Sequence, residues 1–137
     1  MTDCIFCAMQ RGDIPFVEVL SGEHFFAFLD IGPLNHGHVL IVPKEHYANV
    51  FEVPAALGDE LLKTMQILGK AIMDATGAGG LNVVQNNFAP SGQAVFHVHW
   101  HLIPRFEGDG LLKWTPGKYD NQDQMTALAE TIRKVLA

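Results

Sequence analysis

Short apolar runs separated by turn residues dominate much of the chain and predict a β-sheet. We expect strands at residues 16–20, 25–30, 38–43, 81–86 and 96–104, most of them bounded by Gly, Pro, Asn or Ser. From residue 54 to residue 76 apolar side chains recur every three or four positions, which predicts one long amphipathic helix. Its apolar face is formed by Leu57, Leu61, Met65, Leu68 and Ile72.

A second amphipathic helix is expected near the C-terminus, from about Gln122 to Leu136. Its apolar stripe must bury against the sheet or against a partner chain, and consists of Met125, Leu128, Ala129, Ile132, Val135 and Leu136. Because short connections join most of the strands, the predicted fold class is α+β: a five-stranded antiparallel sheet with one long helix and an added C-terminal helix. We interpret residues 1–137 as a single domain, with its core at about 4–106 and a tail at about 107–137.

Composition narrows the possible functions. The chain has 137 residues, a formal net charge of −6 and 48% hydrophobic residues, which is typical of a globular domain. The negative charge argues against non-specific nucleic-acid binding, and no apolar run approaches the roughly 20 residues that a membrane helix needs. The first residues lack the basic and apolar parts of a signal peptide, so we expect a cytoplasmic protein that binds neither nucleic acid nor membrane.

Three of the seven histidines stand at alternate positions in the segment HVHWHLIPR, residues 97–105. On a strand, alternate side chains point to the same face, so His97, His99 and His101 share one face and the apolar residues between them point into the core. Neutral imidazole has a free lone pair at pH 7, because its ordinary pKa is about 6.5. The segment therefore predicts a metal site or a histidine nucleophile rather than a row of surface histidines.

The segment NNFAPSGQAVF, which immediately precedes the histidines, favours chemistry at phosphorus. Its Gly- and Ser-rich portion can present backbone N–H groups to an anion. Ser91, Gln93 and Asn86 add neutral side-chain donors for charge on phosphate oxygens. A histidine that attacks phosphorus forms a labile phosphoramidate, which splits one difficult displacement into two easier ones.

Together these residues resemble the histidine-triad superfamily. The signature of that family is His-φ-His-φ-His-φ-φ, with φ apolar, and residues 97–103 match it without a mismatch as HVHWHLI. The similarity includes residues 27–46 and 81–87 and covers most of the chain, from about Cys4 to Arg105. The resemblance implies a homodimer in which two five-stranded sheets join into one, with a nucleotide site on each protomer.

The resemblance also implies roles for single residues. His99 matches the nucleophile that attacks the α-phosphorus of a nucleotide conjugate, and His101 and His38 match histidines that orient it and contact the phosphate. Asp30 matches a carboxylate that accepts hydrogen bonds from both ribose hydroxyls. Around the nucleotide, the matching polar residues are Asn86 and Gln93, and the apolar walls are Ile5, Phe6, Phe28 and Ile31. The expected reaction is hydrolysis of a purine nucleoside phosphoramidate or a dinucleoside polyphosphate, with release of nucleoside monophosphate.

Zinc-containing members of the family suggest a second site. They use a C-x-x-C near the N-terminus, a histidine after a Pro-Lys segment and the first triad histidine, which correspond to Cys4, Cys7, His46 and His97. Two thiolates and two imidazoles make a closed tetrahedral set, as expected of structural rather than catalytic Zn²⁺. We therefore expect structural zinc and no organic cofactor.

Two other functions remain open from the sequence. Close nucleotide-binding relatives have a hydroxyl residue three positions before the first triad histidine, where this chain has Ala94. A nucleotide-binding regulatory module with little turnover is therefore the main alternative. The other is a metalloenzyme in which the three histidines bind a catalytic metal that keeps an open position.

Overall fold

Five antiparallel strands form the centre of the structure, a computed structural model that describes residues 4–137. The strands are β1 (Glu18–Ser21), β2 (Phe25–Leu29), β3 (Val39–Pro43), β4 (Gly80–Val84) and β5 (Trp100–Arg105). Their order across the sheet is β1-β2-β3-β5-β4, and every neighbouring pair is antiparallel. The predicted α+β fold with a five-stranded antiparallel sheet is confirmed.

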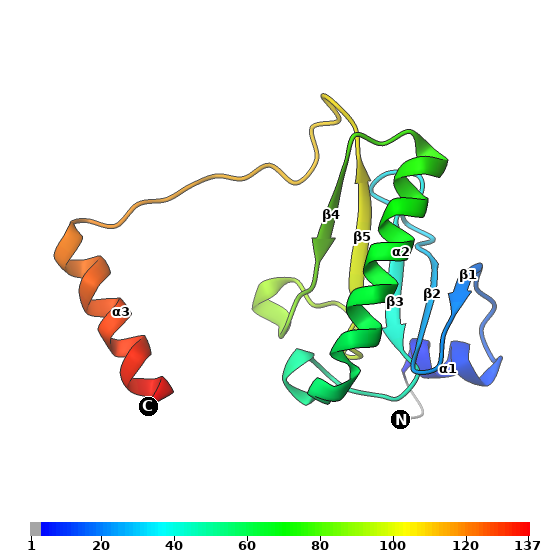
Figure 1. Ribbon diagram of the computed structural model, residues 1–137, viewed down its shortest axis with the longest axis horizontal. Helices are drawn as coiled ribbons and strands as arrows, with labels where there is room; N and C mark the ends of the chain where they lie inside the picture. Colours follow the sequence, from blue (N-terminus) through cyan, green and yellow to red (C-terminus); the bar gives the residue numbers. More distant parts are fainter. Residues whose placement is uncertain (1–3) are drawn as a thin grey trace.

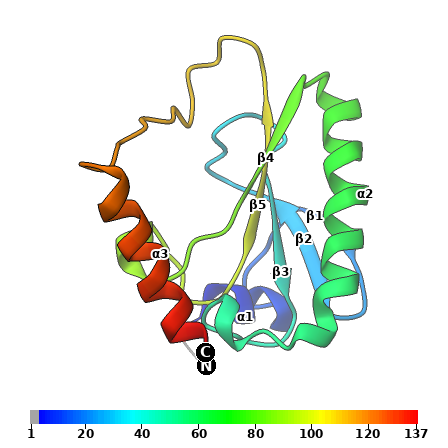
Figure 2. The same ribbon diagram turned by 60° about the vertical axis from the view of Figure 1, so that its left-hand side comes forward.

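The long helix α2 (Gly58–Thr76) lies along one face of this sheet (Figures 1 and 2). Leu68 and Ile72, from its predicted apolar stripe, are buried there. They belong to one cluster with the apolar residues of the histidine segment, Val98, Trp100 and Leu102. The apolar side of the histidine segment is therefore packed beneath α2, as the alternation of the sequence predicted.

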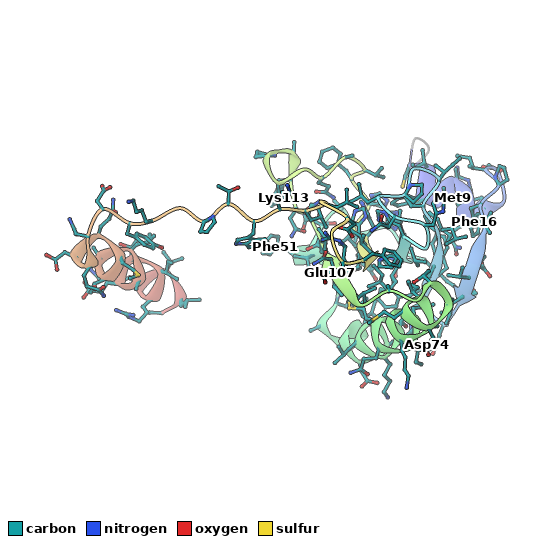
Figure 3. The ribbon with its side chains drawn as sticks, turned by 90° about the horizontal axis from the view of Figure 1, so that it is seen from above. Met9, Phe16, Phe51, Asp74, Glu107 and Lys113 are labelled. Carbon is teal, nitrogen blue, oxygen red and sulfur yellow. The ribbon has the colours of Figure 1, made fainter. Side chains whose placement is uncertain are left out.

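A second layer covers the opposite face of the sheet. The short helix α1 (Ile5–Arg11) places Phe6 in a buried cluster with Phe26, Phe28, Leu40 and Val42. Seen from above, the labelled Met9 of α1 and Asp74 of α2 lie on opposite sides of the sheet (Figure 3). The sequence analysis did not predict α1, because seven residues are too few to show a helical period.

The histidine segment is only partly a strand, which corrects the predicted strand at 96–104. β5 begins at Trp100, where its ladder with β3 also ends. Extending this register would bring Val98 opposite Pro43, which has no N–H to donate. The Val98 N–H instead donates to the Tyr47 carbonyl at 2.7 Å. The first two triad histidines therefore lie just outside the sheet, and only the third lies within it.

The C-terminal helix α3 (Gln122–Leu136) lies apart from the sheet, at the end of an extended segment (Figure 1). Its predicted bounds are confirmed, and the Asn121 side chain caps its first turn by accepting from the Gln124 N–H. None of its residues is buried, so the sheet of the same chain does not cover its apolar stripe. Across residues 4–137, no helix is both long and apolar enough to cross a membrane.

We expect Ile41→Ala to lower the free energy of unfolding by about 2–5 kcal/mol, because Ile41 in β3 is fully buried and its truncation leaves a cavity. Ile31→Ala is the matched control, since Ile31 is fully exposed and its truncation should change stability by less than about 0.5 kcal/mol. Chemical denaturation followed by tryptophan fluorescence measures both variants. Equal losses of stability would contradict this packing.

Candidate active site and metal centre

His99 is held in one tautomer by the backbone of its own segment. Its Nδ1 lies 2.8 Å from the His97 carbonyl oxygen, and because a carbonyl can only accept, Nδ1 carries the proton. Nε2 of the same ring is then unprotonated and has a lone pair. Burial lowers the pKa of His99, so the ring is neutral at pH 7, and Phe6 packs edge-on against it. His99 thus has the form that a nitrogen nucleophile needs.

A hydrogen-bonded pair, His38 and His101, lies beside the His99 ring. The Leu34 N–H donates to His38 Nδ1 at 3.1 Å, so His38 carries its proton on Nε2. His38 Nε2 lies 2.9 Å from His101 Nδ1, which therefore accepts and leaves His101 Nε2–H as a donor. The ring centroids of His99 and His101 are 5.0 Å apart, and burial lowers the pKa of His101 to about 4. The pair thus presents a neutral N–H donor next to the His99 ring.

Asp30, directly after β2, places a carboxylate beside this pair. Its Oδ2 lies 3.6 Å from His38 Nε2, while its Oδ1 accepts from the Gly32 N–H at 2.8 Å. The Asp30 side chain is 21% exposed, so a ligand can reach it. The structure therefore brings Asp30 to the predicted histidines, and its contact with ribose hydroxyls stays a prediction.

The Gln93 and Ser91 side chains of the loop before the histidines make hydrogen bonds within the protein. The Gln93 amide is 5% exposed; its Oε1 accepts from the Phe88 N–H, and its Nε2 donates to the carbonyls of Ala48 and Val95. The Ser91 hydroxyl donates to the backbone of the same loop. Both side chains therefore hold the shape of the loop, and their predicted contacts with the nucleotide stay predictions.

Asn86 differs from these two loop residues. It is half-buried, and within residues 4–137 its side chain makes no hydrogen bond to the protein. Its amide therefore stays available as a donor, and its predicted contact with the nucleotide remains a prediction.

The residues predicted as apolar walls separate into two groups. Phe6 and Phe28 are buried core residues whose rings contact each other edge-on, and Phe6 also contacts the rings of His97 and His99. Ile5 and Ile31 are exposed, at 43% and 103%. The two phenylalanines thus form part of the core beneath the histidines, whereas the isoleucines are at the surface and their contact with a base stays a prediction.

Cys4, Cys7, His46 and His97 form a compact cluster beside the triad. His97 Nδ1 lies 3.3 Å from Cys4 Sγ, 3.6 Å from Cys7 Sγ and 3.1 Å from His46 Nδ1. Its Nε2 lies 2.9 Å from the Pro43 carbonyl and must donate to it, so Nδ1 has the free lone pair. The edges of a tetrahedral zinc site with N and S ligands are about 3.3–3.8 Å long. The four donor atoms therefore fit a divalent zinc ion.

The chain assembles this cluster from three places. Cys4 caps the N-terminus of α1, and Cys7, three residues later, lies in its first turn, with the Cys7 N–H donating to Cys4 Sγ. His46 follows β3, and His97 precedes β5. The C-x-x-C spacing is compatible with a helix, because residues three apart share one helix face, but two cysteines alone do not predict one.

The groups that fix the histidine tautomers are backbone atoms, and the sequence analysis did not identify them. The His97 carbonyl sets the tautomer of His99, and the Leu34 N–H sets that of His38. No side-chain pattern signals a backbone donor or acceptor, so only the folded geometry shows these roles.

The chain belongs to the HIT family, since the family model described as HIT domain matches residues 11–108. An uncharacterised HIT-like protein of Methanocaldococcus jannaschii is 47% identical over 130 residues, covering 93% of this chain and 97% of its own. An adenosine 5'-monophosphoramidase of Schizosaccharomyces pombe is 40% identical over 130 residues, covering 94% and 95%. An adenylylsulfatase of Arabidopsis thaliana is 39% identical over 109 residues; the match covers 80% of this chain and only 55% of the plant protein.

Solved structures agree with this assignment. A HIT family protein from Bacillus subtilis superposes with a TM-score of 0.88 at 35% identity, covering 98% of each chain. A histidine-triad family protein from Mycobacterium smegmatis, described as Zn-bound, superposes with a TM-score of 0.76 at 29% identity, also covering 98% of each chain. The likeness therefore extends beyond the sheet into the C-terminal part of the chain.

We expect acid to destabilise the fold between about pH 6.5 and pH 4. A histidine in the unfolded chain has a pKa of about 6.5, whereas burial lowers the pKa of folded His101 to about 4. Between these values the unfolded state binds the extra proton, so the free energy of unfolding decreases as the pH falls. His101→Gln removes this group and should make the decrease shallower, as thermal unfolding at a series of pH values would measure.

His24→Gln provides a control of opposite sign. A hydrogen bond to Glu60 raises the pKa of His24, so His24 adds stability below pH 6.5 that is lost as the pH rises. Its replacement should remove the stability that the wild type gains as the pH falls toward 6.5, and should leave the slope between pH 6.5 and pH 4 unchanged. If the free energy of unfolding changed with pH in the same way in His101→Gln and His24→Gln, the burial of His101 and the His24–Glu60 hydrogen bond would not have these effects.

Proposed function

We propose that this protein hydrolyses nucleotide conjugates through a nucleotidyl-histidine on His99. His99 Nε2 attacks the α-phosphorus; the N–P bond forms as the bond to the leaving group breaks, and the leaving group takes a proton from solvent. Water then displaces the imidazole from phosphorus and loses a proton to solvent, which restores neutral His99. The observation that carries this proposal is the hydrogen bond from His99 Nδ1 to the His97 carbonyl, which leaves Nε2 unprotonated.

The neighbouring groups have complementary roles in this mechanism. His101 Nε2–H donates to a non-bridging oxygen of the reacting phosphate, where negative charge is held in the transition state. His38 holds His101 in the tautomer that makes this donation possible. Asp30 accepts hydrogen bonds from the ribose hydroxyls, and the Asn86 amide donates to the phosphate.

The substrate we propose is a purine nucleoside phosphoramidate, with a dinucleoside polyphosphate as the second choice. Relatives named adenosine 5'-monophosphoramidase and adenylylsulfatase support an adenosine nucleotide as the conjugate that is cleaved. Ile5 and Ile31 expose apolar surface that suits a purine ring.

We propose that Cys4, Cys7, His46 and His97 bind a structural Zn²⁺. The donor set and its spacing support this, and one structural neighbour is described as Zn-bound. When bound, zinc would cross-link α1 to the histidine segment, and four protein ligands leave no open position for catalysis. His97 is then a ligand, and the chemistry depends on the other two triad histidines. No organic cofactor is needed.

We also propose a cytoplasmic homodimer. The apolar face of α3 is uncovered, and Val83 on the edge strand β4 is 50% exposed, so a second copy has surfaces to cover. A reducing compartment keeps Cys4 and Cys7 available as thiolate ligands. The purine nucleotide and the second copy are the partners of this proposal, which includes neither nucleic acid nor membrane.

A nucleotide-binding regulatory module with little turnover is the second candidate. Ala94 offers no hydroxyl, and the donors of Gln93 and Ser91 are used inside the loop. Fewer side-chain donors then face the leaving group, which favours binding over rapid release.

We expect His99→Ala to lower the release of AMP from adenosine 5'-phosphoramidate by about 10³-fold or more, because the nucleophile is lost. His24→Ala, which replaces an exposed histidine outside the site, should keep the wild-type rate. Product release followed by chromatography measures both, and mass spectrometry of quenched wild type should detect a nucleotidyl adduct on His99. Tight nucleotide binding by wild type without release would favour the regulatory module, and full activity of His99→Ala would exclude the mechanism.

Metal content separates the structural zinc from a catalytic three-histidine site. Cys4→Ser/Cys7→Ser should lose bound zinc and unfold at a lower temperature, because two of the four ligands are gone. His99→Ala should retain one zinc per chain, since His99 is not a ligand. Elemental analysis of the purified variants decides between a structural zinc site and a catalytic three-histidine site. Zinc retained without the cysteines but lost without His99 would show the metal to be held by the triad.

A further inference from the structure

The end of β5 is held by a dense polar cluster built around Asp109. The Asp109 carboxylate accepts from the Arg105 guanidinium, with Nε at 2.9 Å, and from the backbone N–H groups of Phe106 and Leu111. These contacts fix the turn where the chain leaves the sheet, near the labelled Glu107 in Figure 3. Asp109 lies just beyond the residues that the HIT family model matches.

Asn35 connects this cluster to the loop before β3. Its Nδ2 donates to Asp109 Oδ2 at 3.0 Å and to the Pro104 carbonyl at 2.9 Å. Pro104 lies in β5, three residues after His101. One amide thus ties the loop of residues 33–37 both to the triad strand and to Asp109.

The loop held by Asn35 contains the group that sets the His38 tautomer. The Asn35 carbonyl accepts from the His38 N–H at 3.1 Å, and the adjacent Leu34 N–H donates to His38 Nδ1. The loop is also tightly packed, because Gly37 has a φ of +101° and a Cβ there would lie 2.8 Å from the Thr76 side chain. Because the loop is held at Asn35 and packed tightly at Gly37, the Leu34 N–H has little freedom to turn away from His38 Nδ1.

We propose that Asn35 and Asp109 are positioning residues for the His38–His101 pair. Asp109 holds Asn35, Asn35 holds the loop, and the Leu34 N–H in that loop keeps His38 protonated on Nε2. His38 then donates to His101 Nδ1, which leaves the His101 Nε2–H for the substrate. This inference deepens the proposed hydrolase function and rests on it for the effect on catalysis. The tautomer that it assigns does not depend on any substrate.

The experiment compares two amides of the same cluster. Asn35→Ala removes the direct hydrogen bonds to the loop, whereas Asn82→Ala removes an amide on β4 that accepts from Arg105 at 2.7 Å and reaches the loop only through Arg105 and Asp109. For Asn35→Ala we expect kcat to fall roughly 10- to 100-fold while KM changes less than about threefold, because the donor beside the nucleophile is misplaced. Asn82→Ala should keep the wild-type kcat. Asp109→Ala should lower kcat in the same direction as Asn35→Ala.

Long-range ¹H–¹⁵N NMR spectra of the imidazole rings give the second readout, without substrate. Wild type and Asn82→Ala should show His38 with Nδ1 unprotonated, and Asn35→Ala should show a mixture of tautomers for His38 and His101. Asn35→Ser serves in the same way if the alanine variant does not fold. Unchanged tautomers in the Asn35 variants, or equal kcat losses in Asn35→Ala and Asn82→Ala, would overturn the inference. An inactive wild type with the expected tautomers would overturn the hydrolase function and leave the positioning intact.

Discussion

His97 connects the two candidate sites, and both depend on how its polar atoms are used. Its carbonyl accepts from His99 Nδ1, its Nε2–H donates to the Pro43 carbonyl, and its Nδ1 faces the sulfurs of Cys4 and Cys7. These contacts hold residues 97–99, which lie beyond the end of the hydrogen-bonded ladder between β3 and β5. A movement of His97 would therefore release the His99 tautomer and separate the donor atoms of the cysteine–histidine cluster at the same time. The orientation of the His99 ring therefore depends on the same residue as the arrangement of the Cys4 and Cys7 sulfurs around His97.

The site keeps its imidazoles neutral by burial rather than by charge. Burial lowers the pKa of His38, His97, His99 and His101, because a charged ring is poorly solvated in the interior. A buried neutral ring is still costly if its nitrogens lack partners. Here each ring is bonded to a backbone group or to another ring, and among residues 4–137 no buried side-chain nitrogen or oxygen lacks a hydrogen bond. The same bonds that offset the cost of burial also select the tautomers, so stability and reactivity have a common origin.

The sequence predicted those features that leave a periodic or spaced pattern of side chains. The stripe through Leu68 and Ile72 predicted α2, and the alternation around Trp100 predicted which side of the histidine segment faces the core. It did not predict α1, since its seven residues show no period, nor the late start of β5, which depends on the missing N–H of Pro43 in a distant strand. The tautomers of His38 and His99 depend on backbone atoms that any residue carries. The pattern of apolar and polar residues therefore predicts which side chains lie close together. Which nitrogen of each histidine ring carries the proton depends on contacts that only the folded structure provides.

The loop before the triad is held in shape by one buried side chain, that of Gln93. Phe88 has a φ of +69°, which is unfavourable for a bulky side chain, and its N–H donates to Gln93 Oε1 at 2.7 Å. The Gln93 amide also donates to Ala48 and Val95, so one buried side chain holds three backbone segments. A loop fixed in this way before a ligand arrives loses little conformational entropy on binding. These hydrogen bonds come from Gln93 and Phe88, so they do not depend on a hydroxyl at position 94, where this chain has Ala94.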